Sequence, residues 1–332
     1  MLRIGLDIGY GHTKIVTDTG SKICFPSIVK RGEKQQYDRM LYHMDDYLAT
    51  INGEVWYIGT MALRENEGTT RAFEGSDRYN TSAFKAMLAT ALAASNPNND
   101  EVLLVTGVPL SSYGDGKNEF ESFLNKFSAK VEINDKEQYV KIDHAYVFPQ
   151  AAGIFFNPRS LLAITEKVFP GTIVTIIDIG YRTTDVAAFE YDGQRHNFIN
   201  DYSFTVDQGM VGVFRELSSV IAKDIKAFDV DLDIAERVFA SGVYRDNNKN
   251  LEYRDICNKI GDKIVTSIVD KYNLKRPTGA KSNLTVLAGG GSIALKNQLL
   301  EAFPYAITVE DAQFANAIGF LEVGKRLETS IF

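Results

Sequence analysis

The sequence predicts an α/β protein with two lobes. A short motif occurs twice, as Asp7-Ile8-Gly9-Tyr10 and Asp178-Ile179-Gly180-Tyr181, and a threonine follows each aspartate at the same spacing, at Thr13 and Thr184. The chain has 332 residues, 45% of them hydrophobic, which is enough to bury two cores. Because a chain of this length contains on the order of one coincidental four-residue repeat, the residues around each copy decide its meaning.

Both copies lie in the pattern of two strands joined by a tight turn. Apolar residues alternate with others from Leu2 to Ile8, and residues 14–17 resume an extended pattern after the first motif. Residues 172–177 form a buried type of run before the second motif, and residues 184–189 follow it. Each copy therefore predicts strand, glycine turn, strand, with a carboxylate where the first strand ends.

This kind of turn suits phosphate. Glycine lets the backbone approach an anion, successive N–H groups can cradle its oxygens, and a nearby aspartate can hold Mg²⁺ through water. Two copies could hold one nucleotide from opposite sides. The structural alternative is a pair of ordinary β-hairpins with glycine turns, and the duplication favours phosphate binding over it.

The remaining elements of the first half follow in order. Residues 31–78 are polar and charged around a β-like run at 55–58, and predict an inserted subdomain or an exposed flap. A helix is expected over 83–94, a buried strand that ends in a turn over 102–109, and a further helix from the apolar stripe at 120, 123, 124 and 127. Pro149 suits the first turn of a helix, which would place Gln150 at the helix start.

In the second half, apolar stripes predict helices over 210–221, after Gly209, and over 256–268, with polar loops and short helices between them. A buried strand over 283–288 ends at Gly289-Gly290-Gly291-Ser292, and one helix carrying apolar residues from 293 to 300 follows. A helix N-terminus there favours an anion. A last helix is expected around 314–321, where Ala315, Ala317 and Gly319 permit close packing.

Composition excludes several classes of protein. The formal net charge is −7 and no long Lys/Arg run occurs, which argues against direct DNA binding. Cys24 and Cys257 lack metal-ligand spacing, so a reducing cytoplasm fits better than a disulfide framework. No apolar stretch approaches the ~20 residues needed to cross a bilayer, so neither secretion nor membrane insertion is expected.

Five landmarks, in this order and spacing, resemble the actin superfamily, which includes actins, sugar kinases and heat-shock chaperone ATPases. In the terms of that superfamily they are phosphate-1 (7–14), connect-1 (149–153), phosphate-2 (178–185), adenosine (287–292) and connect-2 (316–320). The two phosphate motifs together look most similar to the ParM group, the plasmid-segregating bacterial actins and their archaeal ParM-like relatives. Tyr181-Arg182 departs from the small residues that actins usually carry in the second phosphate loop.

The resemblance implies a two-lobed actin-like ATPase fold, made of duplicated ribonuclease H-like domains with small inserted subdomains. Domain I is expected over 1–155, with the insertion at 31–80. Domain II is expected over 156–315, with an insertion at 207–283, and a C-terminal helix over 316–332 would return to domain I.

The resemblance also implies a mechanism. Two lobes would close over ATP or GTP with Mg²⁺, whose water shell Asp7 and Asp178 would hold, and Lys14 would neutralise phosphate charge. Gln150 would orient the attacking water; because a glutamine is not a strong base, slow hydrolysis is expected. The structural alternative for Gln150 is a helix N-terminal residue that bonds backbone. Glu216 is placed near a ribose hydroxyl by position alone.

The residues expected to bind the nucleotide are Gly9, Tyr10, Gly11, His12, Thr13, Lys14, Gly180, Tyr181, Arg182, Thr183, Thr184, Gly209, Glu216, Gly289, Gly290, Gly291 and Ser292. His12 has a structural alternative as an exposed loop histidine with no role. Asp7 and Asp178 complete the expected site as the metal and catalytic carboxylates.

In this family nucleotide drives head-to-tail assembly, a contact that does not close and so propagates as a filament. The expected partners are further copies of the chain and a DNA-binding adaptor of a plasmid partition system.

A sugar or acid kinase of the same fold is the main alternative, with an acidic general base such as Asp185 facing a substrate. A cell-shape actin of the MreB type is a further alternative, although no N-terminal amphipathic membrane anchor is evident. The sequence leaves ATP against GTP, filament architecture, adaptor identity and host open.

Overall fold

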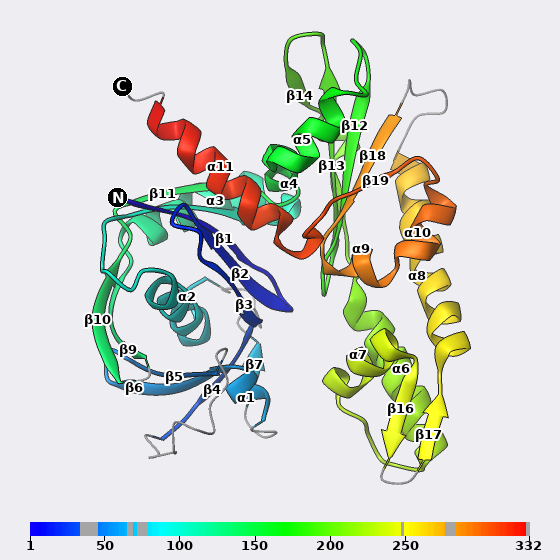
Figure 1. The fold of residues 1–332 in the computed structure, drawn as a ribbon, viewed down its shortest axis with the longest axis horizontal. Helices are drawn as coiled ribbons and strands as arrows, with labels where there is room; N and C mark the ends of the chain where they lie inside the picture. Colours follow the sequence, from blue (N-terminus) through cyan, green and yellow to red (C-terminus); the bar gives the residue numbers. More distant parts are fainter. Residues whose placement is uncertain are drawn as a thin grey trace. The chain divides into compact units, whose positions relative to one another are not determined.

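A computed structural model describes residues 1–33, 46–64, 69–71, 79–133, 135–246, 249–275 and 283–329. The chain forms two compact units (Figure 1): unit 1 comprises Met1–Pro158 and Phe314–Phe332, and unit 2 comprises Arg159–Gln313. Part of the insertion expected at 31–80 lies outside the described residues. The assignment of 1–155, 156–315 and 316–332 to actin-like domains I and II and a returning helix stays a prediction.

The central sheet of unit 1 combines a meander with two parallel strands. Its strands are β1 (Leu2–Ile8), β2 (His12–Thr17), β3 (Lys22–Pro26), β8 (Val102–Val108) and β11 (His144–Pro149). Their order is β11-β8-β1-β2-β3, with β8 parallel to both β1 and β11 and antiparallel pairing from β1 to β3. β1 and β8 are buried along nearly their whole length, which explains their apolar residues.

A second sheet of unit 1 has the order β10-β9-β5-β6-β4-β7. Its strands are β4 (Ile28–Arg31), β5 (Asp46–Ile51), β6 (Glu54–Gly59), β7 (Thr70–Arg71), β9 (Ser128–Ile133) and β10 (Lys136–Lys141). Because β5 pairs with β9, the described part of the expected insertion shares its sheet with residues 128–141 and does not form a sheet of its own. The short helix α1 (Thr60–Leu63) follows β6.

Helix α2 (Ser82–Ser95) packs between the two sheets of unit 1 (Figure 1). Thr81 caps its N-terminus by accepting a hydrogen bond from the Phe84 N–H at 3.1 Å. Apolar side chains cover nearly its whole circumference and Met87 and Leu88 are fully buried, as expected of a helix enclosed on two sides. Helix α3 (Leu110–Asn125) ends before Phe127, so the apolar stripe predicted there runs past the helix.

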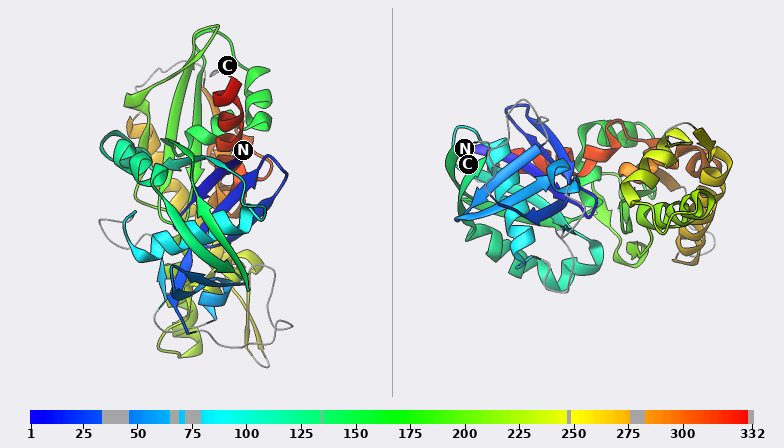
Figure 2. Two further views of the ribbon diagram at one scale, coloured as in Figure 1. Left: turned by 90° about the vertical axis from the view of Figure 1, so that its left-hand side faces the viewer. Right: turned by 90° about the horizontal axis from the view of Figure 1, so that it is seen from below.

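Helices α4 (Ala152–Phe156) and α11 (Ala315–Thr329) pack against each other and against the central sheet; Figure 2 shows α11 beside β1. A Cβ at Gly319 would lie 1.6 Å from the Gly153 carbonyl oxygen, and one at Gly5 would lie 2.0 Å from the Ala317 oxygen. These contacts are possible only with glycine. The expected helix start at Pro149 is wrong: Pro149 ends β11, Ala151 turns the chain with φ 68°, and α4 begins at Ala152.

The sheet of unit 2 has the same arrangement as the central sheet of unit 1. Its strands are β12 (Ile173–Ile179), β13 (Thr184–Tyr191), β14 (His196–Phe198), β15 (Phe204–Val206), β18 (Asn283–Ala288) and β19 (Ile307–Thr308). The order β14-β13-β12-β18-β19 again places a meander beside two parallel strands, and β15 also pairs with β13. Two sheets of one topology are what a duplicated domain predicts.

The described helices of unit 2 are α5 (Pro158–Thr165), α6 (Met210–Ile225), α7 (Leu232–Ser241), α8 (Arg254–Lys275), α9 (Gly290–Ala294) and α10 (Lys296–Ala302). The first residue of α5, Pro158, is also the last residue of the first segment of unit 1. Two expectations were wrong. The helix after the glycines is broken at Leu295 into α9 and α10, and a hairpin of β16 (Val243–Asp246) and β17 (Lys249–Glu252) lies between α7 and α8. Across the described ranges, no helix is long and apolar enough to traverse a bilayer.

Candidate functional site

The two copies of the repeated motif fold into turns of the same backbone geometry. The Gly9 N–H donates to the His12 carbonyl at 3.1 Å, and the Gly180 N–H donates to the Thr183 carbonyl at 2.9 Å. The flanking pairs are equivalent too, since Ile8 lies opposite Thr13 and Ile179 lies opposite Thr184. Both turns therefore present the same backbone at the end of β1 and of β12.

In unit 1, three of the predicted side chains come together beside the turn. Asp7 is 5% exposed and lies opposite Lys14 in the β1–β2 pair. The Lys14 Nζ lies 2.9 Å from Asp7 Oδ2, and the Gln150 Nε2 donates to Asp7 Oδ1 at 3.2 Å. Gln150 follows the end of β11, so the parallel strand order brings it to the same sheet edge as Asp7.

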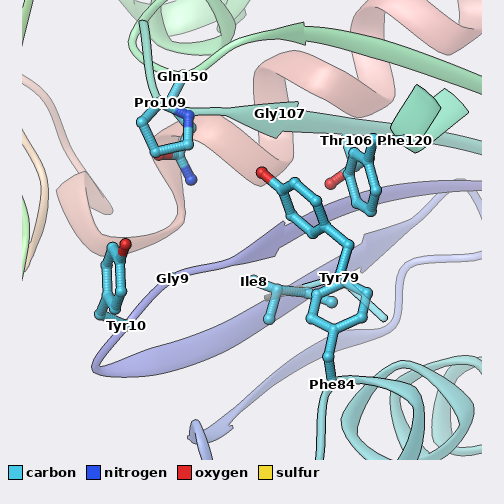
Figure 3. Close-up of a pocket in the computed structure, with 10 residues that line it drawn as sticks. All are labelled: Ile8, Gly9, Tyr10, Tyr79, Phe84, Thr106, Gly107, Pro109, Phe120 and Gln150. Atoms are coloured by element: carbon cyan, nitrogen blue, oxygen red, sulfur yellow. The ribbon is translucent and has the colours of Figure 1, made fainter. Parts of the chain in front are cut away.

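A small pocket adjoins this cluster (Figure 3). It has about 20 Å³ of space and is lined by Ile8, Gly9, Tyr10, Tyr79, Phe84, Thr106, Gly107, Pro109, Phe120 and Gln150. That volume is enough for about one water molecule. The pocket is therefore too small for a nucleoside and suits a single water beside the Gln150 amide.

Positive charge surrounds the first turn. The Arg71 Nη1 donates to the Tyr10 carbonyl at 3.2 Å. Burial, together with the nearby charges of Lys14 and Arg71, lowers the pKa of His12 to about 4. His12 is therefore neutral at pH 7 and can meet a phosphate only as a neutral hydrogen-bonding group. Thr13 is fully buried, and its hydroxyl lies 2.9 Å from the Ser27 hydroxyl.

The second turn carries a carboxylate where the first turn has Lys14. Asp178 lies opposite Asp185 in the β12–β13 pair, where the first turn has an aspartate opposite a lysine. Asp185 is 4% exposed and accepts a hydrogen bond from the Thr205 hydroxyl at 2.5 Å. Two carboxylates at one strand end attract a hard cation such as Mg²⁺.

Glycines from two other segments of unit 2 press against the second turn. A Cβ at Gly289, whose φ is +81°, would lie 2.3 Å from Asp178 Oδ1, and one at Gly209 would lie 2.7 Å from the Tyr181 carbonyl oxygen. The first N–H groups of α6 bond to the turn, from Met210 to Gly180 at 3.2 Å and from Val211 to Tyr181 at 2.7 Å. The start of α6 is thus fastened to the second turn.

The other predicted residues of unit 2 lie at varied places. The Thr184 hydroxyl donates to the Gln208 carbonyl at 2.9 Å, and Arg182 Nε lies 3.9 Å from an Asp207 oxygen. Gly291 packs on Ile179, the Ser292 hydroxyl donates to the Gly289 carbonyl at 2.8 Å, and no atom lies within 4 Å of a Cβ built at Gly290. Glu216 lies on α6 in an ion pair with Lys263 of α8.

Sequence reasoning assigned no role to two residues that support the first turn and the segment holding Gln150. Arg71 lies in the segment interpreted as a flap, and no local pattern marks it. Asn316 is buried and its Oδ1 accepts the Ala151 N–H at 3.2 Å, which holds the left-handed residue next to Gln150. Its position in the connect-2 motif was the available signal.

A metal at this site would find few side-chain ligands among the residues that the structure describes. Within the described ranges, no group of three or more His, Cys, Asp and Glu side chains could hold a metal ion. A divalent cation at Asp7 or Asp178 would therefore take most of its ligands from phosphate oxygens and water, as Mg²⁺ does in nucleotide sites.

The duplicated sheet, the paired aspartate-glycine turns and the glycine-dependent packing of α4 on α11 define an actin-like α/β protein. A family model described as "Actin like proteins N terminal domain" matches residues 5–153, and one described as "Archaeal actin homologue MreB-like, C-terminal" matches residues 176–301. The two actin-like models together cover most of the chain, so the predicted resemblance to the ParM-like actins and the predicted actin-like fold are confirmed.

Individual relatives are similar over nearly the whole chain. Archaeal actin homologs of Thermoplasma volcanium and Thermoplasma acidophilum are 26% identical, over 98% of this chain and 99% of each relative. A 15-stranded ParM filament from Clostridium botulinum has a TM-score of 0.88 at 23% identity, covering 98% of this chain and 99% of that one. The crystal structure of an archaeal actin homolog in complex with ADP has a TM-score of 0.81 at 23% identity, covering 98% and 100%.

Proposed function

We propose that this protein binds ATP or GTP with Mg²⁺, hydrolyses it slowly, and polymerises into cytoskeletal filaments that segregate plasmid DNA. The observation that supports this most is the pair of turns with one backbone geometry and an aspartate at each strand end. An ordinary β-hairpin needs neither the buried aspartate nor the glycines at 209 and 289 that pack against the second turn.

The two turns suit different parts of a Mg-nucleotide. The first turn, with Lys14 and Arg71 close by, suits the negative phosphates. The second turn, with Asp178 opposite Asp185, suits the cation through its water shell. In each turn the glycine N–H is bonded within the turn, so the phosphate contacts fall to the residues that follow the glycine.

Slow hydrolysis follows from the group beside the one-water pocket. Gln150 is held by Asp7 and can orient a water but cannot take its proton as a strong base. We expect Gln150→Ala to retain nucleotide binding and to slow hydrolysis about 10- to 100-fold. A variant that hydrolyses at the wild-type rate would assign Gln150 the structural role of fixing Asp7.

The proposed partners are further copies of the chain, in a head-to-tail contact that does not close, and an adaptor protein bound to plasmid DNA. The formal net charge of −7 favours an adaptor over direct contact with DNA. A reducing cytoplasm suits the free thiols of Cys24 and Cys257. One solved structure that this chain resembles is a ParM filament, and it supports the proposal by similarity of fold.

The test is high-speed sedimentation with negative-stain imaging, without nucleotide and with Mg-ATP, Mg-GTP and a non-hydrolysable analogue. We expect nucleotide-dependent filaments from the wild-type protein. Asp7→Asn and Asp178→Asn are expected to lose nucleotide binding, whereas the exposed controls Asp100→Asn and Asp201→Asn retain it. Nucleotide binding or hydrolysis with no assembly over a broad protein concentration range would favour a small-molecule kinase instead.

A further inference from the structure

Phe228, in the turn between α6 and α7, has the most exposed large apolar side chain of the described residues, with a relative exposure of 106%. The turn that carries it is well ordered by its own contacts. Lys226 ends α6 in the left-handed conformation, and the Ala227 N–H donates to the Ala222 carbonyl at 2.9 Å. On the other side of Phe228, Val230 is buried and anchors the chain. The phenyl ring is therefore presented to solvent on a fixed support.

Carboxylates follow this ring along the chain. Asp229 and Asp231 are exposed, and Asp229 also accepts the Val230 N–H at 2.8 Å. Asp233, in the first turn of α7, pairs with Arg237 at 3.2 Å. Lys226 precedes Phe228 in the sequence, at the end of α6. Phe228 with Asp229 and Asp231 forms an apolar projection with negative charge on one side, which we term the Phe228 knob.

A pocket of matching character lies in unit 1. It has a volume of about 270 Å³ and is lined by Ile51, Asn52, Lys85, Phe123, Lys126, Phe127, Ser128 and Ala129. A cavity of about 150 Å³ is enough to hold a benzene ring, so this pocket can admit a phenylalanine side chain. Its walls include the rings of Phe123 and Phe127, whose centroids are 5.8 Å apart.

Positive charge borders the pocket. The Lys85 Nζ lies 6.0 Å from the centroid of the Phe123 ring and donates to the neutral Asn80 side chain at 2.8 Å. Lys126 is exposed just past the end of α3. Of the described residues that line the pocket, two are lysines and none is acidic. We term this site the Lys85–Lys126 pocket.

We propose that the Phe228 knob of one copy inserts into the Lys85–Lys126 pocket of a second copy, with Asp229 and Asp231 facing the two lysines. An aromatic anchor in an apolar pocket with complementary charges around it is the arrangement that concentrates binding energy at interfaces. The occupant is a second copy because this chain itself carries both complementary parts. The inference deepens the proposed function and rests on it, since it assumes self-assembly.

The contact is heterologous, because knob and pocket are different surfaces on different units. A contact of this type leaves a free knob and a free pocket on every assembled pair, and so it can continue as an open polymer. This supplies a physical contact for the head-to-tail assembly that the repeated turns do not supply.

The first test is Phe228→Ala in the full chain, by sedimentation with the nucleotide that assembles the wild-type protein. We expect at least a tenfold rise in critical concentration with nucleotide binding unchanged. Phe169→Ala is the matched control, because Phe169 is another exposed phenylalanine of unit 2, at 56% exposure. Assembly of Phe228→Ala at the wild-type critical concentration would overturn the contact.

The second test mixes two variants and measures their mass by analytical ultracentrifugation. Phe228→Ala lacks the knob and keeps the pocket, whereas Ser128→Trp fills the pocket from an exposed position and keeps the knob. Only in the mixture can an intact knob, on Ser128→Trp, meet an intact pocket, on Phe228→Ala. We therefore expect more dimer in the mixture than in either variant alone. A mixture without additional dimer, from variants that both bind nucleotide, would also overturn the contact.

The two proposals fail in different ways. If the wild-type protein polymerises and Phe228→Ala does so equally, only the contact is wrong. If the wild-type protein stays monomeric with every nucleotide, the filament function and the contact are both wrong.

Discussion

At the scale of single residues, the two turns have diverged at the position opposite the aspartate. Asp7 and Asp178 end equivalent strands, but Lys14 lies opposite the first and Asp185 opposite the second. In the buried Asp7–Lys14 pair the two opposite charges offset each other. In the Asp178–Asp185 pair two carboxyl groups lie opposite each other. The duplicated backbone thus provides two turns with different ligand preferences.

Loss of Lys14 should destabilise unit 1. The side chains of Lys14 and Asp7 are 14% and 7% exposed, so Lys14→Met leaves a buried carboxylate without its partner. We expect the free energy of unfolding to fall by about 3 kcal/mol. Lys130→Met is the control, because Lys130 and its partner Glu137 are 63% and 61% exposed and such a pair contributes less than about 1 kcal/mol. Urea titration measures both, and equal losses would contradict the prediction.

His12 should make stability depend on pH. Its pKa is about 4 in the folded protein against an ordinary value of 6.5, mainly because it is buried. Between these values the unfolded chain binds a proton that the folded chain does not, so stability is complete above pH 6.5 and is lost as the pH falls toward 4. The expected loss is about 3 kcal/mol at most. His12→Gln should flatten the profile of unfolding free energy over this range; parallel profiles for the two proteins would refute the assignment.

The residues that could be predicted from the sequence to lie at the turns are those within the repeated motif itself. Asp7 and Lys14 were predictable because a two-strand pattern with a fixed turn length sets them opposite each other. Arg71 and Thr205 were not, because separate strands bring them to the turns and no local pattern encodes that pairing. Glu216 was placed by position alone, and the structure pairs it with Lys263.

At the scale of elements, glycines at 5, 153 and 319 let α11 approach both β1 and α4 with almost no separation. Phe320 of α11 is fully buried, and its ring lies where a Cβ at Gly107 or Gly153 would be. This packing fixes the end of β11, after which Gln150 and the left-handed Ala151 lead into α4. The geometry near Gln150 therefore depends on a helix from the end of the chain.

Gly319→Ala should disrupt this packing. The new Cβ would lie 1.6 Å from the Gly153 carbonyl oxygen, a backbone atom that cannot rotate away. We expect a loss of more than about 3 kcal/mol or failure to fold. Gly212→Ala in α6 is the matched control: nothing lies within 4 Å of its Cβ, so helix propensity should raise stability by about 0.5 kcal/mol. Thermal unfolding followed by circular dichroism should show a lower melting temperature for Gly319→Ala and a higher one for Gly212→Ala.

Strands with a nearly continuous apolar run were predictable from the sequence. Boundaries marked by a residue that fits more than one element, or by no marker residue at all, were not. The strand at 283–288 has the predicted bounds, and the strand predicted within 102–109 spans 102–108, because burial on both faces favours a nearly continuous apolar run. Pro149 misled, because proline suits the end of a strand as well as the first turn of a helix. The break between α9 and α10 at Leu295 has neither glycine nor proline, so no residue in the sequence marks it.

At the scale of the whole molecule, unit 2 is one continuous segment, whereas unit 1 is completed by the C-terminal segment. α11 packs on β1 and β8, so a fragment that stops at Pro158 would expose the apolar side chains that Phe320 and Val323 cover. The two units therefore have different requirements for folding.

Fragments should show this difference. We expect residues 159–313 to fold alone, residues 1–158 to lack a cooperative transition, and residues 1–158 joined to 314–329 by a flexible linker of about ten residues to regain it. Thermal melts and amide dispersion in nuclear magnetic resonance spectra are the measurements. A cooperative melt of 1–158 alone would contradict the role given to α11.

The late position of α11 also has a consequence for synthesis on the ribosome. β1 is made before the whole of Arg159–Gln313, whereas the helix that covers it is made after that segment. At roughly 5–20 residues per second, this delay is on the order of ten seconds. A nascent chain, or one truncated before α11, would thus lack a finished unit 1, so synthesis of α11 would itself decide which chains can fold that unit.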